Sequence, residues 1–115
     1  MAPNQPGTVY RLASLYESLS DSSRARSLYR DFLQLVAQSN RADAFFMRQK
    51  ARALYRTGSD NQALAVLETA RARYPFDFEI INDYAEVLIY QKRYEQALAL
   101  LDQMEAMKQK VDTGG

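Results

Sequence analysis

The sequence predicts an all-α protein of three helical hairpins, and an internal repeat is the main reason. Shifting the block that begins at Ala44 by 34 residues, onto the block that begins at Phe78, brings the small and the large apolar positions into register. A fixed period of about 20–50 residues is typical of stacked-repeat folds. Apolar residues recur at helical spacing along the chain, and no stretch alternates apolar and polar residues long enough to indicate a strand.

Two residues mark the clearest breaks between the expected helices. Gly58 accepts the left-handed backbone conformation that ends a helix, and Pro75 pushes the residue before it out of helical geometry. The expected helices span residues 8–18, 22–39, 42–57, 60–74, 78–91 and 94–110. They form a repeat domain over residues 8–110, with repeats at about 6–39, 44–77 and 78–110, between a flexible leader (1–7) and a flexible tail (111–115).

Side chains suited to helix capping stand at four of the expected helix starts. Asp21 lies in the polar stretch before the second helix, and Asp43 and Asp77 lie at the starts of the third and the fifth, where a negative charge is favourable. Ser59 is followed three residues later by Gln62, a spacing that predicts a capping box at the start of the fourth helix.

The composition excludes several classes of function. The 115 residues contain neither Cys nor His, which removes disulfides, thiol catalysis, the Ser–His–Asp arrangement and the commonest metal ligand. The net charge of +1 gives no field strong enough to attract nucleic acid or an anionic membrane. No apolar run is long enough to span a bilayer. We therefore expect no catalytic residues, no metal, no cofactor and no membrane insertion by this segment.

The repeating residues resemble those of the tetratricopeptide repeat family. That family places a small residue midway along the first helix, a large apolar residue three positions on, a small residue at the start of the second helix, then a bulky residue and a closing proline. The matching residues are Ala51, Leu54, Ala63, Leu67 and Pro75 in the second repeat, Ala85, Leu88, Ala97 and Leu101 in the third, and Ala13, Tyr16, Ala25 and Tyr29 in the first, whose second helix is about a turn longer. The resemblance implies a right-handed solenoid cut from a longer array.

The resemblance also implies a concave groove, lined by the first helix of each repeat, that holds a protein partner. Arg48, Arg52 and Arg56 lie four residues apart and share one helix face, and such a stripe could bind a carboxylate or phosphate. The expected partner-binding residues are Phe45, Arg48, Arg52, Tyr55, Arg56, Asn82, Glu86, Ile89 and Tyr90. Tyr10, Ser14, Glu17 and Glu79 line the same groove by position.

Other interpretations of this arginine stripe stay open. The arginines could form a solvated face, or pair with Glu79, Asp83 and Glu86 of the fifth helix. They could contact the phosphates of a nucleic acid, although the near-zero net charge argues against that function. The segment could also be a structural spacer. Basic residues are concentrated before Gly58 and acidic residues after it, so we expect the groove to be basic toward its N-terminal end and acidic toward its C-terminal end.

The sixth helix is expected to leave an apolar edge. A stacked hairpin buries its face only against a neighbour, and no capping helix follows the sixth helix in the sequence. The expected edge residues are Leu100, Met104, Met107 and Val111, and we expect the chain to self-associate through them.

These observations together favour a non-catalytic scaffold that binds a protein partner within a larger assembly. Arg outnumbers Lys eleven to four, which favours a GC-rich bacterial source. Similar arrays occur in bacterial envelope scaffolds, including those of exopolysaccharide secretion and export, so the resemblance favours the periplasm slightly over the cytoplasm.

Overall fold

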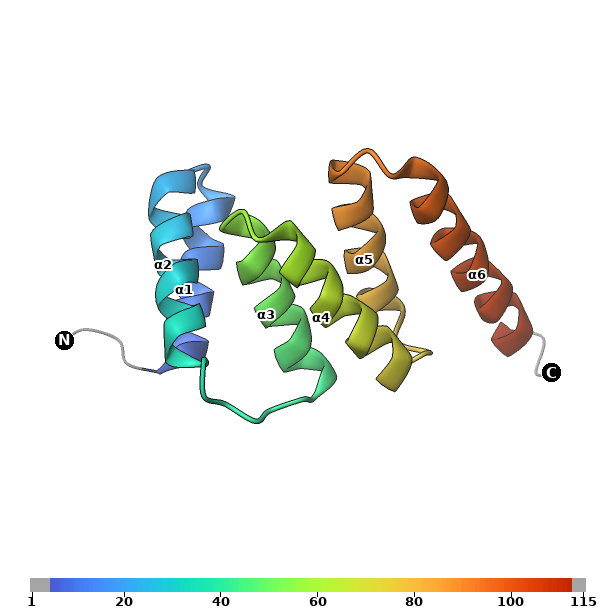
Figure 1. The fold of residues 1–115 in the computed structure, drawn as a ribbon, viewed down its shortest axis with the longest axis horizontal. Coiled ribbons are helices and arrows are strands. Elements are labelled where there is room, and N and C mark those ends of the chain that lie inside the picture. The colour runs from blue at the N-terminus through green and yellow to red at the C-terminus, as the bar shows by residue number, and fades with distance from the viewer. Residues whose placement is uncertain (1–4, 113–115) are drawn as a thin grey trace.

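Across the described residues, 5–112, the computed structural model contains six α-helices and no strand (Figure 1). The helices are α1 (Pro6–Ser18), α2 (Ser22–Leu35), α3 (Ala44–Arg56), α4 (Asp60–Arg73), α5 (Phe78–Tyr90) and α6 (Tyr94–Asp112). Within each hairpin α1 packs on α2, α3 on α4 and α5 on α6, and neighbouring hairpins meet through α2–α3 and α4–α5. The predicted all-α fold of three helical hairpins is confirmed.

Each hairpin closes through the same backbone turn. One residue in each turn is left-handed, with φ of 64° at Ser20, 89° at Gly58 and 62° at Lys92. The residue that follows donates its backbone N–H back across the turn to a carbonyl oxygen of the first helix. The acceptors are the carbonyl oxygens of Tyr16, Leu54 and Leu88, at 2.9, 2.8 and 2.8 Å. This arrangement gives partners to carbonyl groups that the helix itself leaves unpaired.

Aspartate side chains cap three helices, as the sequence predicts. The capping residues are Asp21 for α2, Asp43 for α3 and Asp77 for α5. The capping box predicted at Ser59 is wrong, because the Ser59 side chain makes no capping hydrogen bond. In a capping box the Gln62 side chain would accept a hydrogen bond from the backbone N–H of Ser59. That N–H already donates to the Leu54 carbonyl oxygen in the hairpin turn, so it is not free for Gln62.

Several predicted boundaries also differ from the structure, among them the start of the third helix, which lies at Ala44 and not at residue 42. The second helix ends at Leu35 and not at residue 39, because Val36 is the last buried residue before a polar stretch that has nothing to bury. α1 begins at Pro6, inside the predicted leader, since proline loses no hydrogen bond in the first helical turn. α6 extends to Asp112, into the predicted tail. The remainder of the leader (1–4) and of the tail (113–115) lies outside the described residues.

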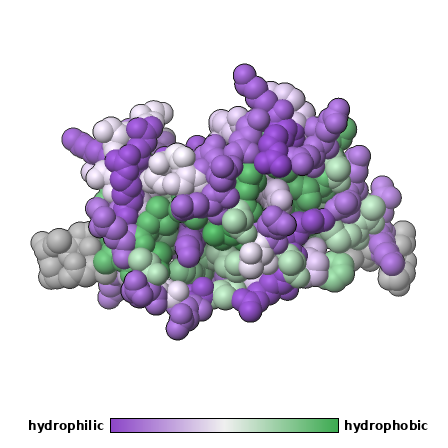
Figure 2. Space-filling view, in the orientation of Figure 1, coloured by the Kyte–Doolittle hydropathy of each residue, from purple (hydrophilic) through white to green (hydrophobic). Residues whose placement is uncertain are grey.

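Two core clusters meet at α3. Ala53 belongs to the cluster that α3 shares with α1 and α2, whereas Ala51 belongs to the cluster that it shares with α4, α5 and α6. The repeated alanines are all buried and allow close approach of the helices: Ala13, Ala25, Ala51, Ala63, Ala85 and Ala97. Figure 2 shows a band of hydrophobic residues across the middle of one face, between margins of hydrophilic residues.

The apolar edge predicted for the sixth helix is wrong for Leu100 and Met104, whereas the predicted self-association stays a prediction. Leu100 and Met104 are buried in the core, and Met107 packs against it partly buried. They follow Ala97 at helical spacing and therefore share the face that packs on α5. The side chain of Val111 lies outside the described part of the chain.

Candidate partner-binding face

The first arginine of the predicted stripe is bound by α5. Arg48 Nε–H donates a 2.7 Å hydrogen bond to Asp83 Oδ2, and its guanidinium also pairs with Glu79. The hydrogen bond to Asp83 raises the pKa of Arg48 above its ordinary value. This side chain is mostly buried, and it joins the second hairpin to the third. Its donors are used inside the chain.

A carboxylate on α1 collects the next contacts. Glu17 Oε1 accepts a 2.8 Å hydrogen bond from the hydroxyl of Tyr29, and the carboxylate pairs closely with Arg56. Arg52 Nε lies 3.5 Å from the same oxygen that Tyr29 contacts. Glu17 therefore links α1, α2 and α3. The sequence does not reveal that Glu17 pairs with Arg52 and Arg56. The first and second hairpins are not spaced by the 34-residue period, so the repeat does not place α1 against α3.

Arg52 is the least satisfied arginine of the three. The contact with Glu17 is its only ion pair among the described residues, and its buried Nε has no hydrogen-bond partner. The Arg56 Nε also lacks an aligned hydrogen bond, but Arg56 pairs closely with Glu17 and lies 4.0 Å from Glu86. The Arg52 side chain is 40% exposed, against 28% for Arg48 and Arg56. Its guanidinium is thus the one most open to an outside acceptor.

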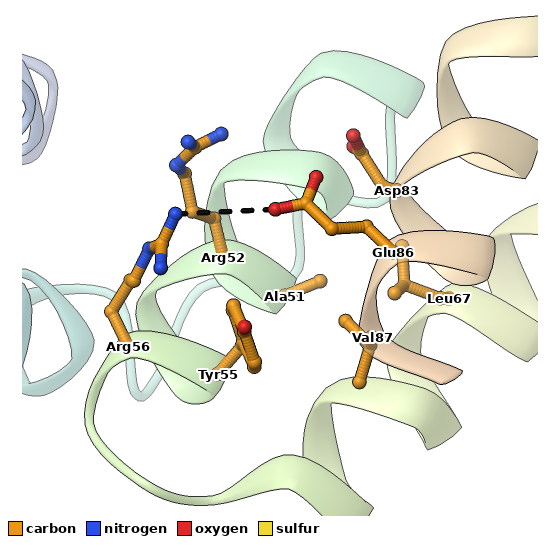
Figure 3. A pocket seen from close by; sticks show the side chains of 8 residues that line it. All are labelled: Ala51, Arg52, Tyr55, Arg56, Leu67, Asp83, Glu86 and Val87. Carbon is orange, nitrogen blue, oxygen red and sulfur yellow. Dashed lines mark ion pairs between the residues drawn. The ribbon is translucent and has the colours of Figure 1, made fainter. Parts of the chain in front are cut away.

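A small cavity lies beneath these charges, between α3 and α5. Figure 3 shows Glu86 extending from α5 toward the guanidinium of Arg56 at its edge. The lining residues are Ala51, Arg52, Tyr55, Arg56, Leu67, Asp83, Glu86 and Val87. The volume is about 20 Å³, room for about one water molecule and not for a ligand. This cavity is therefore too small to take up a side chain of another molecule.

Aromatic side chains stand beside the charges. The rings of Tyr55 and Tyr90 lie 5.2 Å apart between their centroids, and Tyr90 is 62% exposed. Burial, with Tyr90 beside it, raises the pKa of Tyr55. Ile89, next along α5, is also exposed. An apolar surface thus adjoins the arginine stripe where α3 and α5 end.

The structure brings together some of the predicted site residues and separates others. Arg52, Tyr55, Arg56, Glu86 and Tyr90 lie together, as described above. Phe45 is exposed near the start of α3, ten residues and about 15 Å along the helix from Tyr55. Asn82 is exposed in the first half of α5, and Ser14 and Tyr10 are half-buried on α1. Tyr10 instead packs its ring against Tyr29 and Phe32.

The charges on this face are paired and not separated by sign. Arg48 and Arg56 contact carboxylates of α5, an alternative that the sequence leaves open. Glu17 adds an acidic group at the N-terminal end, where the sequence led us to expect a basic one. Among residues 5–112, no set of three His, Cys, Asp or Glu side chains is arranged to hold a metal ion. Within the same range, no helix combines the length and the apolarity needed to cross a membrane.

Three stacked hairpins whose first helices share a face of charged and aromatic side chains define a helical-repeat protein. Two sequence models described as tetratricopeptide repeat match the chain, one over residues 8–39 and one over residues 61–112. The chain belongs to the tetratricopeptide repeat family. One of the two models covers the first repeat by itself, although the residues of that repeat fit the family pattern least well. The other match begins in α4 and runs through the third repeat.

Similar solved structures agree on the fold. One is the crystal structure of a putative kinesin light chain from Podosopora anserina with nearly identical TPR-like repeats, and another is a single-residue variant of that protein. Their TM-scores are 0.68 and 0.71 at 19% and 18% identity, over 96% and 97% of this chain. This chain spans 58% of each of those chains, and at this identity the likeness shows the fold alone. No curated protein matches the sequence.

Proposed function

We propose that this chain is a non-catalytic scaffold that binds a protein partner over the face formed by α1, α3 and α5, around Arg52, Tyr55 and Tyr90. Tetratricopeptide repeats generally mediate protein–protein interaction. The particular face is our proposal. It rests on the exposure of Tyr90, on the partial exposure of Arg52, on the contact of the Tyr55 ring with Tyr90 and on the unequal pairing of the arginines.

The long ion pair and the 40% exposure of the Arg52 side chain are the observation that carries the proposal, because its guanidinium is the least tightly held of the three. A partner that supplies a carboxylate or carbonyl oxygen can accept charge-assisted hydrogen bonds from the exposed part of the Arg52 guanidinium. The exposed Tyr90 ring lies close enough to receive an apolar side chain of the same partner, and Tyr and Arg are the residues that most often dominate binding energy. The partner segment should therefore carry an acidic residue near an apolar one.

A displayed library of random peptides tests this face while the natural partner is unidentified. Peptides selected on the wild-type chain are measured against Arg52→Gln and Tyr90→Ala by titration calorimetry. We expect both variants to weaken binding at least tenfold and the selected peptides to be enriched in Asp or Glu. Arg30→Gln is the matched control, because Arg30 is an exposed arginine on α2, away from this face.

Single substitution at Arg52 is preferable to removing the whole stripe. Arg48 and Arg56 hold α5 and α1, so their loss would perturb the stacking of the hairpins as well as any binding. Circular dichroism and urea unfolding of Arg52→Gln show that the fold is kept. Peptides that bind Arg52→Gln and Tyr90→Ala as tightly as wild type would contradict the proposal.

The other functions considered from the sequence have less support from the geometry. Carboxylates neutralise most of the arginine stripe, so a phosphate backbone would have to displace Asp83 and Glu17 to reach Arg48 and Arg56. A place in a bacterial polysaccharide-export assembly stays a prediction from the sequence.

A further inference from the structure

α6 carries two large side chains, Tyr94 and Leu98, that are mostly exposed, and the internal repeat indicates what covers the position equivalent to Leu98 elsewhere. Leu98 lies 34 residues after Leu64 and holds the same register. Leu64 is 8% exposed, within the core where α5 packs on α4, whereas Leu98 is 60% exposed. Tyr94 is exposed one turn earlier, and Leu101 is partly buried one turn later. We call the exposed pair, Tyr94 and Leu98, the C-terminal face.

The opposite end of the molecule shows the complementary pattern. Aligning Ala13 with Ala51 places Leu15 in the register of Ala53 on α3 and of Val87 on α5. Ala53 and Val87 are 0% and 4% exposed, because α2 and α4 pack on their helices. Leu15 is 54% exposed. Leu12 and Leu15 lie on one side of α1, the exposed Leu19 follows them at its C-cap, and we call the three the N-terminal face.

The two faces are therefore the two halves of a contact that the chain already makes twice internally. The helices that carry them, α1 and α6, belong to the hairpins at opposite ends of the molecule (Figure 1). The hairpins that carry the two faces also differ in the sign of their net charge. The α1–α2 hairpin has four basic and three acidic residues, whereas the α5–α6 hairpin has four basic and seven acidic residues. Contact of α6 with a second α6 would bring acidic hairpins together, whereas contact of α6 with α1 would not.

We propose that a second copy of this chain docks its N-terminal face on the C-terminal face, head to tail, as α5 docks on α4. Such a contact joins two different surfaces, so it leaves a free face at each end of the pair and permits further copies to add. The contact does not involve Arg52, Tyr55 or Tyr90, and it is independent of the partner-binding face proposed above.

Two charge variants test the proposal by complementation. Leu15→Glu blocks the N-terminal face and Leu98→Glu blocks the C-terminal face, and both side chains are exposed, so the fold should tolerate the change. Sedimentation velocity of the wild type over a series reaching about 1 mM should show species that grow with concentration. Each variant alone should stay monomeric. An equal mixture of the two should form a 1:1 complex and nothing larger, because each partner offers one intact face.

Two controls separate this contact from other causes. Phe76→Glu, which changes an exposed apolar residue in the loop between α4 and α5, should associate like the wild type, as should Arg52→Gln. A wild-type chain that stays monomeric throughout the series would overturn the proposal. So would Leu15→Glu associating as strongly as the wild type, or a mixture that forms no complex.

Discussion

The hydroxyl of Tyr29 donates a 2.8 Å hydrogen bond to Glu17, and this contact joins the two helices of the first hairpin, the second of which packs on α3. The Tyr29 ring is fully buried, and the carboxylate that it contacts also pairs with Arg56. Glu17 therefore keeps its place on the face of α3 partly through Tyr29.

Tyr29→Phe should lower the free energy of unfolding by about 1–2 kcal/mol, because it removes a hydrogen bond to a charged group while it keeps the buried ring. Urea unfolding measures the difference. Tyr94→Phe is the control, since that ring is exposed on α6 and should change stability by less than about 0.5 kcal/mol. Equal stability of Tyr29→Phe and wild type would show that the hydrogen bond contributes nothing.

Alkaline pH should destabilise the chain through the same tyrosine. Burial, and then the hydrogen bond to Glu17, raise the pKa of Tyr29 from its ordinary value of 10.0. In the unfolded chain the phenol ionises near pH 10, while in the folded chain it stays protonated. Its contribution to stability is thus fully present below about pH 10 and is lost as the pH rises above it. The free energy of unfolding, measured in urea between about pH 8 and 11, should fall less steeply for Tyr29→Phe than for wild type.

The left-handed turn residues should respond to substitution in opposite ways. A left-handed backbone costs a residue with a side chain about 1–2 kcal/mol, and Lys92 bears that cost whereas Gly58 does not. Lys92→Gly should therefore stabilise the chain, and Gly58→Ala should destabilise it, each by about 1 kcal/mol. A Cβ at Gly58 would meet no atom within 4 Å, so the loss would be conformational and not steric. Thermal unfolding of both variants checks the pair of signs.

Two neighbouring caps should differ in their importance. Asp77 accepts hydrogen bonds from the backbone N–H groups of Glu79 and Ile80, so Asp77→Ala should cost about 0.5–2 kcal/mol. Ser59 makes no side-chain capping bond, and Ser59→Ala should change stability by less than about 0.5 kcal/mol. The comparison is made by urea unfolding, and equal losses would argue that Ser59 caps α4 after all.

Equivalent leucines should have unequal effects on stability. Leu64→Ala removes a buried side chain and should cost about 2–4 kcal/mol, whereas Leu98→Ala removes an exposed one and should cost less than about 0.5 kcal/mol. The measurement is made at low protein concentration, where head-to-tail contacts between copies are absent. A large loss for Leu98→Ala under those conditions would mean that this side chain is covered within the chain.

The repeat period predicts the fold well, because each repeated small residue meets a neighbouring helix at the same place. Ala51 and Ala85 occupy equivalent positions and both are buried. Helix caps are less predictable where they depend on backbone hydrogen bonds in the hairpin turn. The Ser59 N–H is engaged by Leu54, and no pattern of side chains reveals that competition.

The candidate site is less predictable, because its pairs join residues far apart in the sequence. Helical spacing groups Arg52 and Arg56 on one face, but it does not show that Glu17 lies across from them. The sixth helix has a related difficulty. It has two apolar stripes, and periodicity cannot tell which one packs inward, whereas the register of Leu98 with Leu64 could have identified the outer stripe.

Ser20, Gly58 and Lys92 occupy the same left-handed turn, so one hairpin of this chain has the shape needed to stand in the place of another. Because each hairpin turns through the same hydrogen-bonded geometry, a designer could splice a second copy of residues 44–77 between the existing second and third repeats. The inserted hairpin would meet an α4-type surface on one side and an α5-type surface on the other. A rod of adjustable length could then be made from this chain, and each insertion would extend it by one hairpin.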